Sequence, residues 1–234
     1  MTFRILLPVC AGVVLASAAG VASLGLAPAT VDLPAFAAEP LHGPDGAVHV
    51  ARHEVTVADW NRCAAAGACA LELDIRPGLD PEMTPATGIS WLDAQEYLAW
   101  ISLETGHPLR MPTRAEWDAM AGKRRAKKRK PMPGGSDRRP AASDAPTAAL
   151  RATGTFPTGR TGIADLKGPV WEWTSDCYYD DMPDDRCPAF WASGQHEAVI
   201  TVFTRDPANG GCQVGDPPAF MGLRLVSDRP PPKT

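Results

Sequence analysis

Apolar residues recur at helical spacing in the middle of the chain, over residues 91–104. Ser90 precedes this run and Asp93 follows three positions later, an arrangement that resembles a capping box with Asp in place of Glu. Gly106 comes just after the run, where a left-handed residue commonly ends a helix. The pattern predicts a helix whose apolar stripe contains Ala94, Tyr97, Leu98 and Ile101.

A shorter helix is predicted to begin at the next polar signal, Thr113-Arg114-Ala115-Glu116. This tetrapeptide is a complete capping box, because the Thr113 hydroxyl can accept from the backbone of Glu116 while the Glu116 carboxylate reaches back to Thr113. Trp117 and Met120 follow at helical spacing, so we expect both side chains to face the core.

Earlier in the chain, residues 47–55 alternate between apolar and polar positions, which predicts a β-strand. Thr56 follows as an N-cap for a helix over 57–66, and Gly67 is positioned to end that helix. Its buried face is expected to contain Val57, Trp60 and Ala64.

The composition favours one packed, loop-rich α+β domain. Of the 234 residues, 44% are hydrophobic, which is enough for a single core, while 24 Pro and 21 Gly argue against a helical bundle. Trp171 and Trp173 alternate along a strand-like segment, so both should face one side of a sheet. We interpret the seven Trp as core residues, because large aromatic side chains dominate core energetics.

The N-terminus is typical of an export signal. Arg4 is the only charged residue before Asp32, and an apolar run over 5–16 is followed by small residues. The segment Ala35-Phe36-Ala37 matches the small-x-small cleavage rule, which predicts a signal peptide over residues 1–37. Two alternatives remain: a buried core helix, or an uncleaved anchor, since the uncharged stretch 5–30 is long enough to span a bilayer.

The expected organisation after the signal is a linker over 38–47, a domain over 48–228 and a disordered tail over 229–234. We therefore expect a periplasmic or extracellular protein, tethered to the membrane if the N-terminal segment is retained.

Five cysteines remain once Cys10 is assigned to the signal. An exported protein can form disulfides, and the short spacings pair most simply as Cys63–Cys69 and Cys177–Cys187. Connectivity does not follow from sequence alone. Cys212 is left over, and such a thiol is either buried and idle or reactive.

Residues 122–149 are expected to form a mobile loop, because a basic, Pro- and Gly-rich segment buries little apolar area. Nine Lys or Arg and one Asp give residues 123–139 a charge of +8, whereas the whole chain carries -4 and the remainder -12. The net charge argues against nucleic acid as the main partner. An anionic membrane or an acidic partner could bind this segment, although a solvated loop is the more common explanation of such a charge run. The basic run comprises Lys123, Arg124, Arg125, Lys127, Lys128, Arg129 and Lys130.

Several motifs occur in one order along the chain: Arg52-His53-Glu54-Val55-Thr56 leading to Trp60, the segment 88–100, the segment 110–117, Gly168-Pro169-Val170-Trp171-Glu172-Trp173, and Gly222-Leu223-Arg224. Together these motifs resemble the formylglycine-generating enzyme, or sulfatase-modifying factor, family. The resemblance spans residues 48–227 and implies a C-type-lectin-like α+β fold with little regular secondary structure. The members of this family include oxidases, ergothioneine-synthesis domains and non-catalytic accessory proteins.

The resemblance implies a copper site made of two cysteines, because soft thiolates suit Cu(I). The family's pair follows a Gly-Gly-Ser segment, whose counterpart here is Gly210-Gly211-Cys212. No second cysteine follows before Gly222, so the two-cysteine site is absent. We expect no oxidase activity of this type.

The family also implies a calcium site near the Trp-Glu-Trp segment. Glu172 and the Val170 carbonyl are kept, but Pro169 and Gly159 replace two side-chain donors, so we expect Glu172 to be a structural acceptor rather than a metal ligand. Family-type iron chemistry needs a histidine cluster from an additional helical domain. His42, His49 and His53 are too scattered to replace that cluster.

The leading hypothesis is a non-catalytic accessory or binding protein whose partner is an unknown exported protein. One form of this hypothesis is a role in the maturation of an exported enzyme. The candidate binding residues are Glu172, Asp176 and Arg224. A copper- or thiol-dependent oxidase using Cys212 with Cys177, Cys187 or a histidine is the first alternative. A lectin-like module that binds a ligand, with calcium or another cation held by the acidic loop 176–185, is the second.

Overall fold

The computed structural model describes residues 31–43, 46–122, 150–158, 161–179, 182–195, 197–205 and 214–232. The chain divides into two units, Met1–Thr30 and Val31–Thr234, and every described residue belongs to the second. The predictions for residues 1–30, for the loop 123–149 and for Cys212 therefore lie outside the described residues. Within the described part of the chain, none of the helices has the length and apolar character needed to span a bilayer.

The described residues contain the three expected α-helices, and each begins at its predicted cap. The helices are α1 (Val57–Ala65), α2 (Trp91–Thr105) and α3 (Arg114–Met120). Thr56, Ser90 and Thr113 each form a reciprocal capping box with the acidic residue three positions later. The α2 stripe is buried as predicted, and Gly106 ends that helix in the left-handed conformation with φ of 62°.

A small antiparallel sheet carries the N-terminal part of the domain. Its strands are β1 (Leu41–Gly43), β2 (Gly46–Val50) and β7 (Val226–Ser227), in the order β1-β2-β7. The strand expected over 47–55 therefore begins one residue earlier and stops at Val50. Beyond that point, Ala51 forms a bridge with Phe36, while its N–H donates at 2.8 Å to the carbonyl of Leu225, just before β7.

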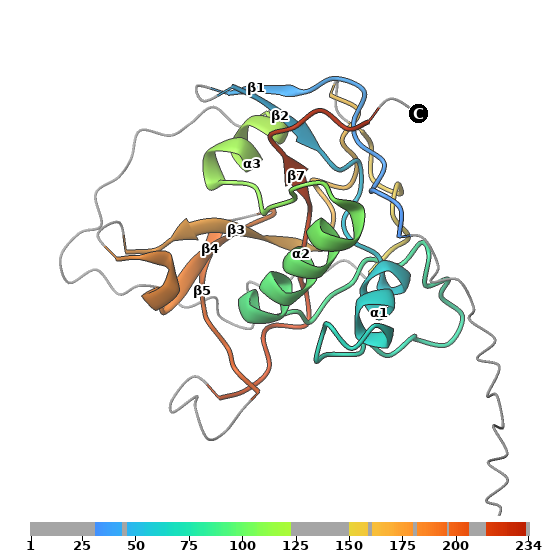
Figure 1. Cartoon of the computed structure of the whole chain (residues 1–234), viewed down its shortest axis with the longest axis vertical. Coiled ribbons are helices and arrows are strands. Elements are labelled where there is room, and N and C mark those ends of the chain that lie inside the picture. The colour runs from blue at the N-terminus through green and yellow to red at the C-terminus, as the bar shows by residue number, and fades with distance from the viewer. Residues whose placement is uncertain are drawn as a thin grey trace, which may run out of the picture. The chain divides into compact units, whose positions relative to one another are not determined.

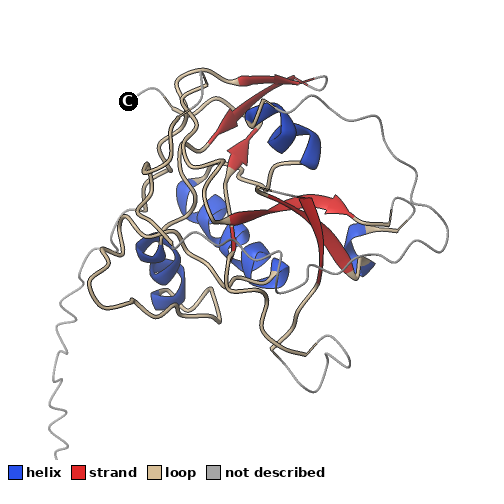
Figure 2. Cartoon of the chain, turned by 180° about the vertical axis from the view of Figure 1, so that it is seen from behind, coloured by secondary structure: helices blue, strands red, loops and turns tan. Residues whose placement is uncertain are grey.

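A second, mixed sheet has the order β5-β4-β3-β6. Strands β3 (Trp171–Cys177), β4 (Ala189–Ser193) and β5 (Glu197–Thr201) are antiparallel, while β6 (Met221–Gly222) runs parallel to β3. A 3-10 turn, η2 (Asp184–Arg186), lies between β3 and β4. In both views α2 lies between α1 and the β3–β5 strands (Figures 1 and 2), so helices and sheets pack together as an α+β domain, as predicted.

Aromatic side chains fill the core between these elements. Five of the seven Trp are at least 93% buried, and the other two, Trp91 and Trp191, are half-buried, which confirms the interpretation of the Trp residues as core. Trp60 stacks on Tyr97 with ring centroids 5.1 Å apart, and Trp91 stacks on Phe190 at 3.9 Å. These pairs join α1 to α2 and α2 to β4, so aromatic contacts determine how the helices lie on the sheet.

Candidate functional site

Two of the three sequence candidates for binding, Glu172 and Arg224, lie side by side in the core. Only 1% of Glu172 and 0% of Arg224 is exposed. The Arg224 guanidinium donates to both carboxylate oxygens of Glu172, with a shortest distance of 2.7 Å from Nη2 to Oε1. Trp117 Nε1 donates to Glu172 Oε2 at 2.7 Å. Both carboxylate oxygens of Glu172 thus accept hydrogen bonds from buried side chains.

Arg224 also cross-links three distant parts of the backbone. Its Nη1 donates to the carbonyl oxygens of Ala51 and Arg52, and its Nη2 donates to that of Ala164, each at 3.0 Å. The side chain therefore satisfies carbonyl groups in the irregular segments that flank β2 and β3. Since the pair has no access to the surface, we assign Arg224 and Glu172 to the scaffold.

Two further carboxyl groups surround this pair. Glu54 Oε1 lies 3.6 Å from Arg224 Nη2, while Glu54 Oε2 has no hydrogen-bond partner among the described residues. Burial, the largest cause, raises the pKa of Glu54 to about 8; Arg224 opposes this shift, while Glu172 and Asp165 add to it. Asp165 accepts from the backbone of Gly154 and Phe156 and contacts His53 Nδ1 at 3.2 Å. One guanidinium thus faces three carboxyl groups, and burial favours the protonated form of Glu54.

This cluster does not suit calcium. A calcium site needs about six to eight oxygen donors around one point, and both oxygens of Glu172 already accept from a cation that is permanently charged. Among the residues that the structure describes, no group of three His, Cys, Asp or Glu is suited to hold a metal ion. His42, His49 and His53 are described residues and form no such group. We therefore place no metal ligand in this part of the core.

Asp176, the third sequence candidate, caps a helix. Its Oδ2 accepts from the Arg114 backbone N–H at 2.6 Å, at the first residue of α3. The Arg114 guanidinium lies 4.0 Å from the centre of the Trp191 ring and forms an ion pair with Glu197. Asp176 therefore joins β3 to α3. Of the acidic loop proposed to bind a cation, Asp180 and Asp181 lie outside the described residues.

Both predicted disulfides are present, Cys63–Cys69 and Cys177–Cys187. They use four of the five cysteines that follow residue 37, and the fifth, Cys212, lies outside the described residues. A two-thiolate copper site needs two reduced sulfurs. It cannot be assembled from Cys212 and one of these four cysteines while both disulfides stand, so the donor set does not fit copper of the family type.

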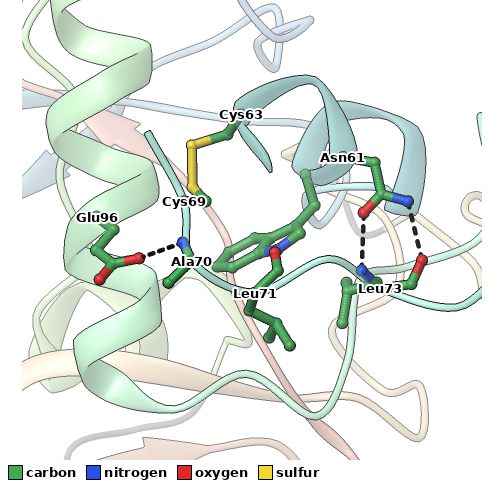
Figure 3. Close-up of a disulfide and its surroundings, with 8 residues drawn as sticks. Asn61, Cys63, Cys69, Ala70, Leu71, Leu73 and Glu96 are labelled. Carbon is green, nitrogen blue, oxygen red and sulfur yellow. Dashed lines mark hydrogen bonds between the residues drawn. A yellow bond between two sulfur atoms is a disulfide. The ribbon is translucent and has the colours of Figure 1, made fainter. Parts of the chain in front are cut away.

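The Cys63–Cys69 disulfide anchors a surface loop that the sequence analysis overlooked, residues 69–87 (Figure 3). Beyond the bridge, Ala70 N–H donates to Glu96 on α2 at 2.9 Å. Asn61 on α1 both donates to and accepts from the backbone of Leu73, each at 2.9 Å (Figure 3). Trp60 Nε1 donates to the Leu71 carbonyl at 2.9 Å. The backbone of the first part of the 69–87 loop is thus held by hydrogen bonds to side chains of both helices.

A pocket of about 300 Å³ opens beside this loop. Three large apolar side chains of the loop are exposed to solvent: Ile75 at 54%, Met83 at 44% and Leu79 at 37%. The alternation of Leu71, Leu73 and Ile75 with acidic residues was the available sequence signal for such a half-exposed extended segment. The pocket is lined by Val57, Leu73, Asp74, Ile75, Arg76, Leu79, Pro81, Thr84, Pro85, Thr87 and Leu150.

Residues 37–229 match the sulfatase-modifying factor enzyme 1-like domain, and the chain belongs to this family. The motifs named above, from Glu54 to Arg224, lie within that match and meet in the buried cluster and the core around it. The predicted family is therefore confirmed.

Among curated proteins, the chain is similar to the serine/threonine-protein kinase pkn1 of Chlamydia pneumoniae. The two are 32% identical over 109 residues, which is 46% of this chain but only 16% of the kinase. The similarity thus covers a small part of that relative.

Three solved structures share the fold. PvdO from Pseudomonas aeruginosa has a TM-score of 0.51 at 20% identity, covering 80% of this chain and 85% of PvdO. Treponema denticola variable protein 1 has a TM-score of 0.52 at 14% identity, with 84% and 94% covered. CarF has a TM-score of 0.52 at 17% identity, with 79% and 88% covered. At these identities the likeness confirms the C-type-lectin-like fold alone.

Proposed function

We propose that this chain is an exported, non-catalytic member of the sulfatase-modifying factor family that acts by binding another exported protein. The observation that carries the proposal is the pairing of cysteines. Four of the five cysteines after residue 37 are consumed by disulfides, which leaves Cys212 without a second thiolate for the family's copper chemistry.

Two disulfides also support export. Disulfides persist in oxidising compartments and are rare in the reducing cytosol. The Cys63–Cys69 disulfide lies in the core, where the two residues are 0% and 5% exposed, so it is an integral part of the folded domain. Together with the apolar N-terminal segment, this pairing supports a periplasmic or extracellular location.

The pocket beside the 69–87 loop is the best supported binding surface. The buried residues Glu172 and Arg224 are out of reach, whereas Ile75 and Leu79 present apolar surface at an open cavity. The anchored first part of the loop keeps this surface preformed, which lowers the entropic cost of binding. We propose that the pocket takes an apolar side chain of the partner.

The first experiment tests the absence of family-type oxidase chemistry. The full chain is exported in a bacterium, purified without reductant, denatured, and its thiols are counted by alkylation and mass spectrometry. We expect alkylation of Cys212 and of none of the four paired cysteines. In parallel, the native protein is loaded with copper and incubated with a cysteine-containing peptide, and no aldehyde is expected. Aldehyde formation that is lost in Cys212→Ser would overturn the proposal in favour of the oxidase.

The second experiment tests the binding surface. Binding of a hydrophobic fluorescent dye is compared between the native protein, Leu79→Glu, and the matched control Leu103→Glu. Leu103 is 79% exposed on α2 and does not line the pocket. We expect Leu79→Glu to lose most dye binding and the control to keep it. Equal dye binding in all three proteins would refute the pocket as the apolar docking surface.

A further inference from the structure

Residues 31–37, which the sequence analysis assigned to the signal peptide, belong to the folded domain. Phe36 forms an antiparallel bridge with Ala51. Ala37 N–H donates to the Val50 carbonyl at 2.8 Å, and Arg52 N–H donates to the Ala35 carbonyl at 2.7 Å. Residues 35–37 thus pair with residues 50–52 through an isolated antiparallel bridge, and the 31–37 segment is part of the domain.

The side chains of this segment are packed as well. Val31, Leu33 and Phe36 pack against the main core, and the Phe36 ring lies edge-on to His107 with centroids 6.1 Å apart. Ala37 is 7% exposed and belongs to the second core cluster, with Val48 and Val50 among its members. The match to the family begins at residue 37, so these contacts extend the folded domain upstream of the matched residues.

Cleavage after Ala37 would remove this segment from the mature protein. The Val50 carbonyl and the Arg52 N–H would lose their partners, and apolar surface under Phe36 would be exposed. Such a signal would also be 37 residues long, beyond the range of about 15–30 residues that export signals usually occupy. Two other Ala-x-Ala sites lie upstream, Ala16-Ser17-Ala18 and Ala27-Pro28-Ala29.

We propose that the mature protein retains residues 31–37 and that signal peptidase cuts at one of these two upstream sites. Water hydrolyses a single peptide bond, either Ala18–Ala19 or Ala29–Thr30, leaving a carboxylate on the released signal and a new ammonium group on the mature chain. Either cut leaves the 31–37 segment and its packing intact. The proposal rests on the export part of the proposed function, and it is independent of the binding role and of the missing copper site.

The direct test is the N-terminus of the exported protein. The full-length chain, with its own N-terminal segment and a C-terminal affinity tag, is expressed in an exporting bacterium and analysed by intact mass and N-terminal sequencing. A mature chain that begins at Ala19 or Thr30 is the expected result. A chain that begins at Ala38, or one that remains uncut from Met1, would overturn the proposal.

A second test measures what the segment contributes. Phe36→Ala in the full chain is compared with Leu92→Ala, whose side chain is 42% exposed on α2. We expect Phe36→Ala to lower the Tm by more than about 4 °C and the control to shift it by less than about 1 °C. Equal Tm values for the two variants would show that the segment is dispensable and that cleavage after Ala37 is tolerated.

Discussion

The buried cluster around Arg224 and the surface loop 69–87 are both held by polar groups, yet they serve different ends. In the cluster, Arg224 and Glu172 satisfy one another and nearby carbonyls, and neither is exposed by more than 1%. In the loop, polar groups such as Asn61 bind the backbone and leave the apolar side chain of Ile75 exposed. Charged family motifs therefore build the scaffold here, whereas the 69–87 loop carries the exposed apolar side chains on which the proposed binding surface rests.

The largest expected effect on stability is that of Arg224→Met, which disrupts the buried cluster. The change leaves Glu172 charged and buried without its cation, and it frees the carbonyls of Ala51, Arg52 and Ala164. We expect a loss of about 3–5 kcal/mol in the free energy of unfolding, measured by urea denaturation. The matched control is Arg62→Met, which removes an exposed ion pair with Asp59 and Glu82 and should cost less than about 1 kcal/mol.

An Arg224→Met protein too unstable to purify would agree with this prediction, provided that Arg62→Met is obtained in normal yield. Similar unfolding curves for both variants would contradict the structural role of Arg224. The same result would reopen Arg224 as a candidate for ligand binding.

Removing the Cys63–Cys69 disulfide tests how the 69–87 loop is held to the domain. The bridge closes a short loop, with a sequence separation of 6, so its entropic contribution is limited to about 2–3 kcal/mol. We expect the double variant Cys63→Ser, Cys69→Ser to lose this amount and to show faster amide hydrogen exchange at Ala70 and Leu73, which lie just beyond the bridge. Unchanged exchange in the loop would mean that the hydrogen bonds to Glu96 and Asn61 suffice to hold it.

Glu54→Gln separates charge from packing inside the cluster. Because burial raises the pKa of Glu54 to about 8, the folded protein binds a proton there that the unfolded chain releases near its ordinary pKa of 4.5. The stabilising effect of that proton is complete below pH 4.5 and is lost as pH rises toward 8. We expect Glu54→Gln and the native protein to differ little at pH 5, and the variant to be more stable by about 2 kcal/mol at pH 8.

The measurement is urea denaturation of both proteins across this pH range, with Glu96→Gln as the control. Glu96 is an exposed carboxylate that accepts from Ala70, so its neutralisation should not reproduce the same pH dependence. A constant difference between Glu54→Gln and the native protein would show that Glu54 is ionised in the fold.

The smallest expected effect belongs to Asn61→Ala, which removes two hydrogen bonds to the backbone of Leu73. We expect a loss of about 1–2 kcal/mol in unfolding free energy, because the Leu73 groups are only partly shielded from water. Asn61→Asp keeps the acceptor but removes the donor, so its loss should fall between zero and that of Asn61→Ala. An Asn61→Asp variant less stable than Asn61→Ala would point to repulsion from nearby acidic residues rather than a missing donor.

Local signals in the chain were enough to predict the three helices and both disulfides. Thr56, Ser90 and Thr113 act on backbone groups within three residues, and Cys63 and Cys69 are separated by six positions, so neither needs distant information. The ordered motifs from Glu54 to Arg224 likewise determined the family and hence the α+β fold.

Which of the motif residues are accessible to a ligand depends on tertiary contacts and does not follow from local sequence signals. Glu172 and Arg224 are 52 positions apart, and their pairing in the core depends on β3 and β6 running side by side. The packing of Phe36 on the core and the pocket beside Leu79 also depend on contacts between distant segments. Burial is a property of the assembled chain, because a charged residue in a motif has the same sequence signal whether it faces a ligand or another side chain.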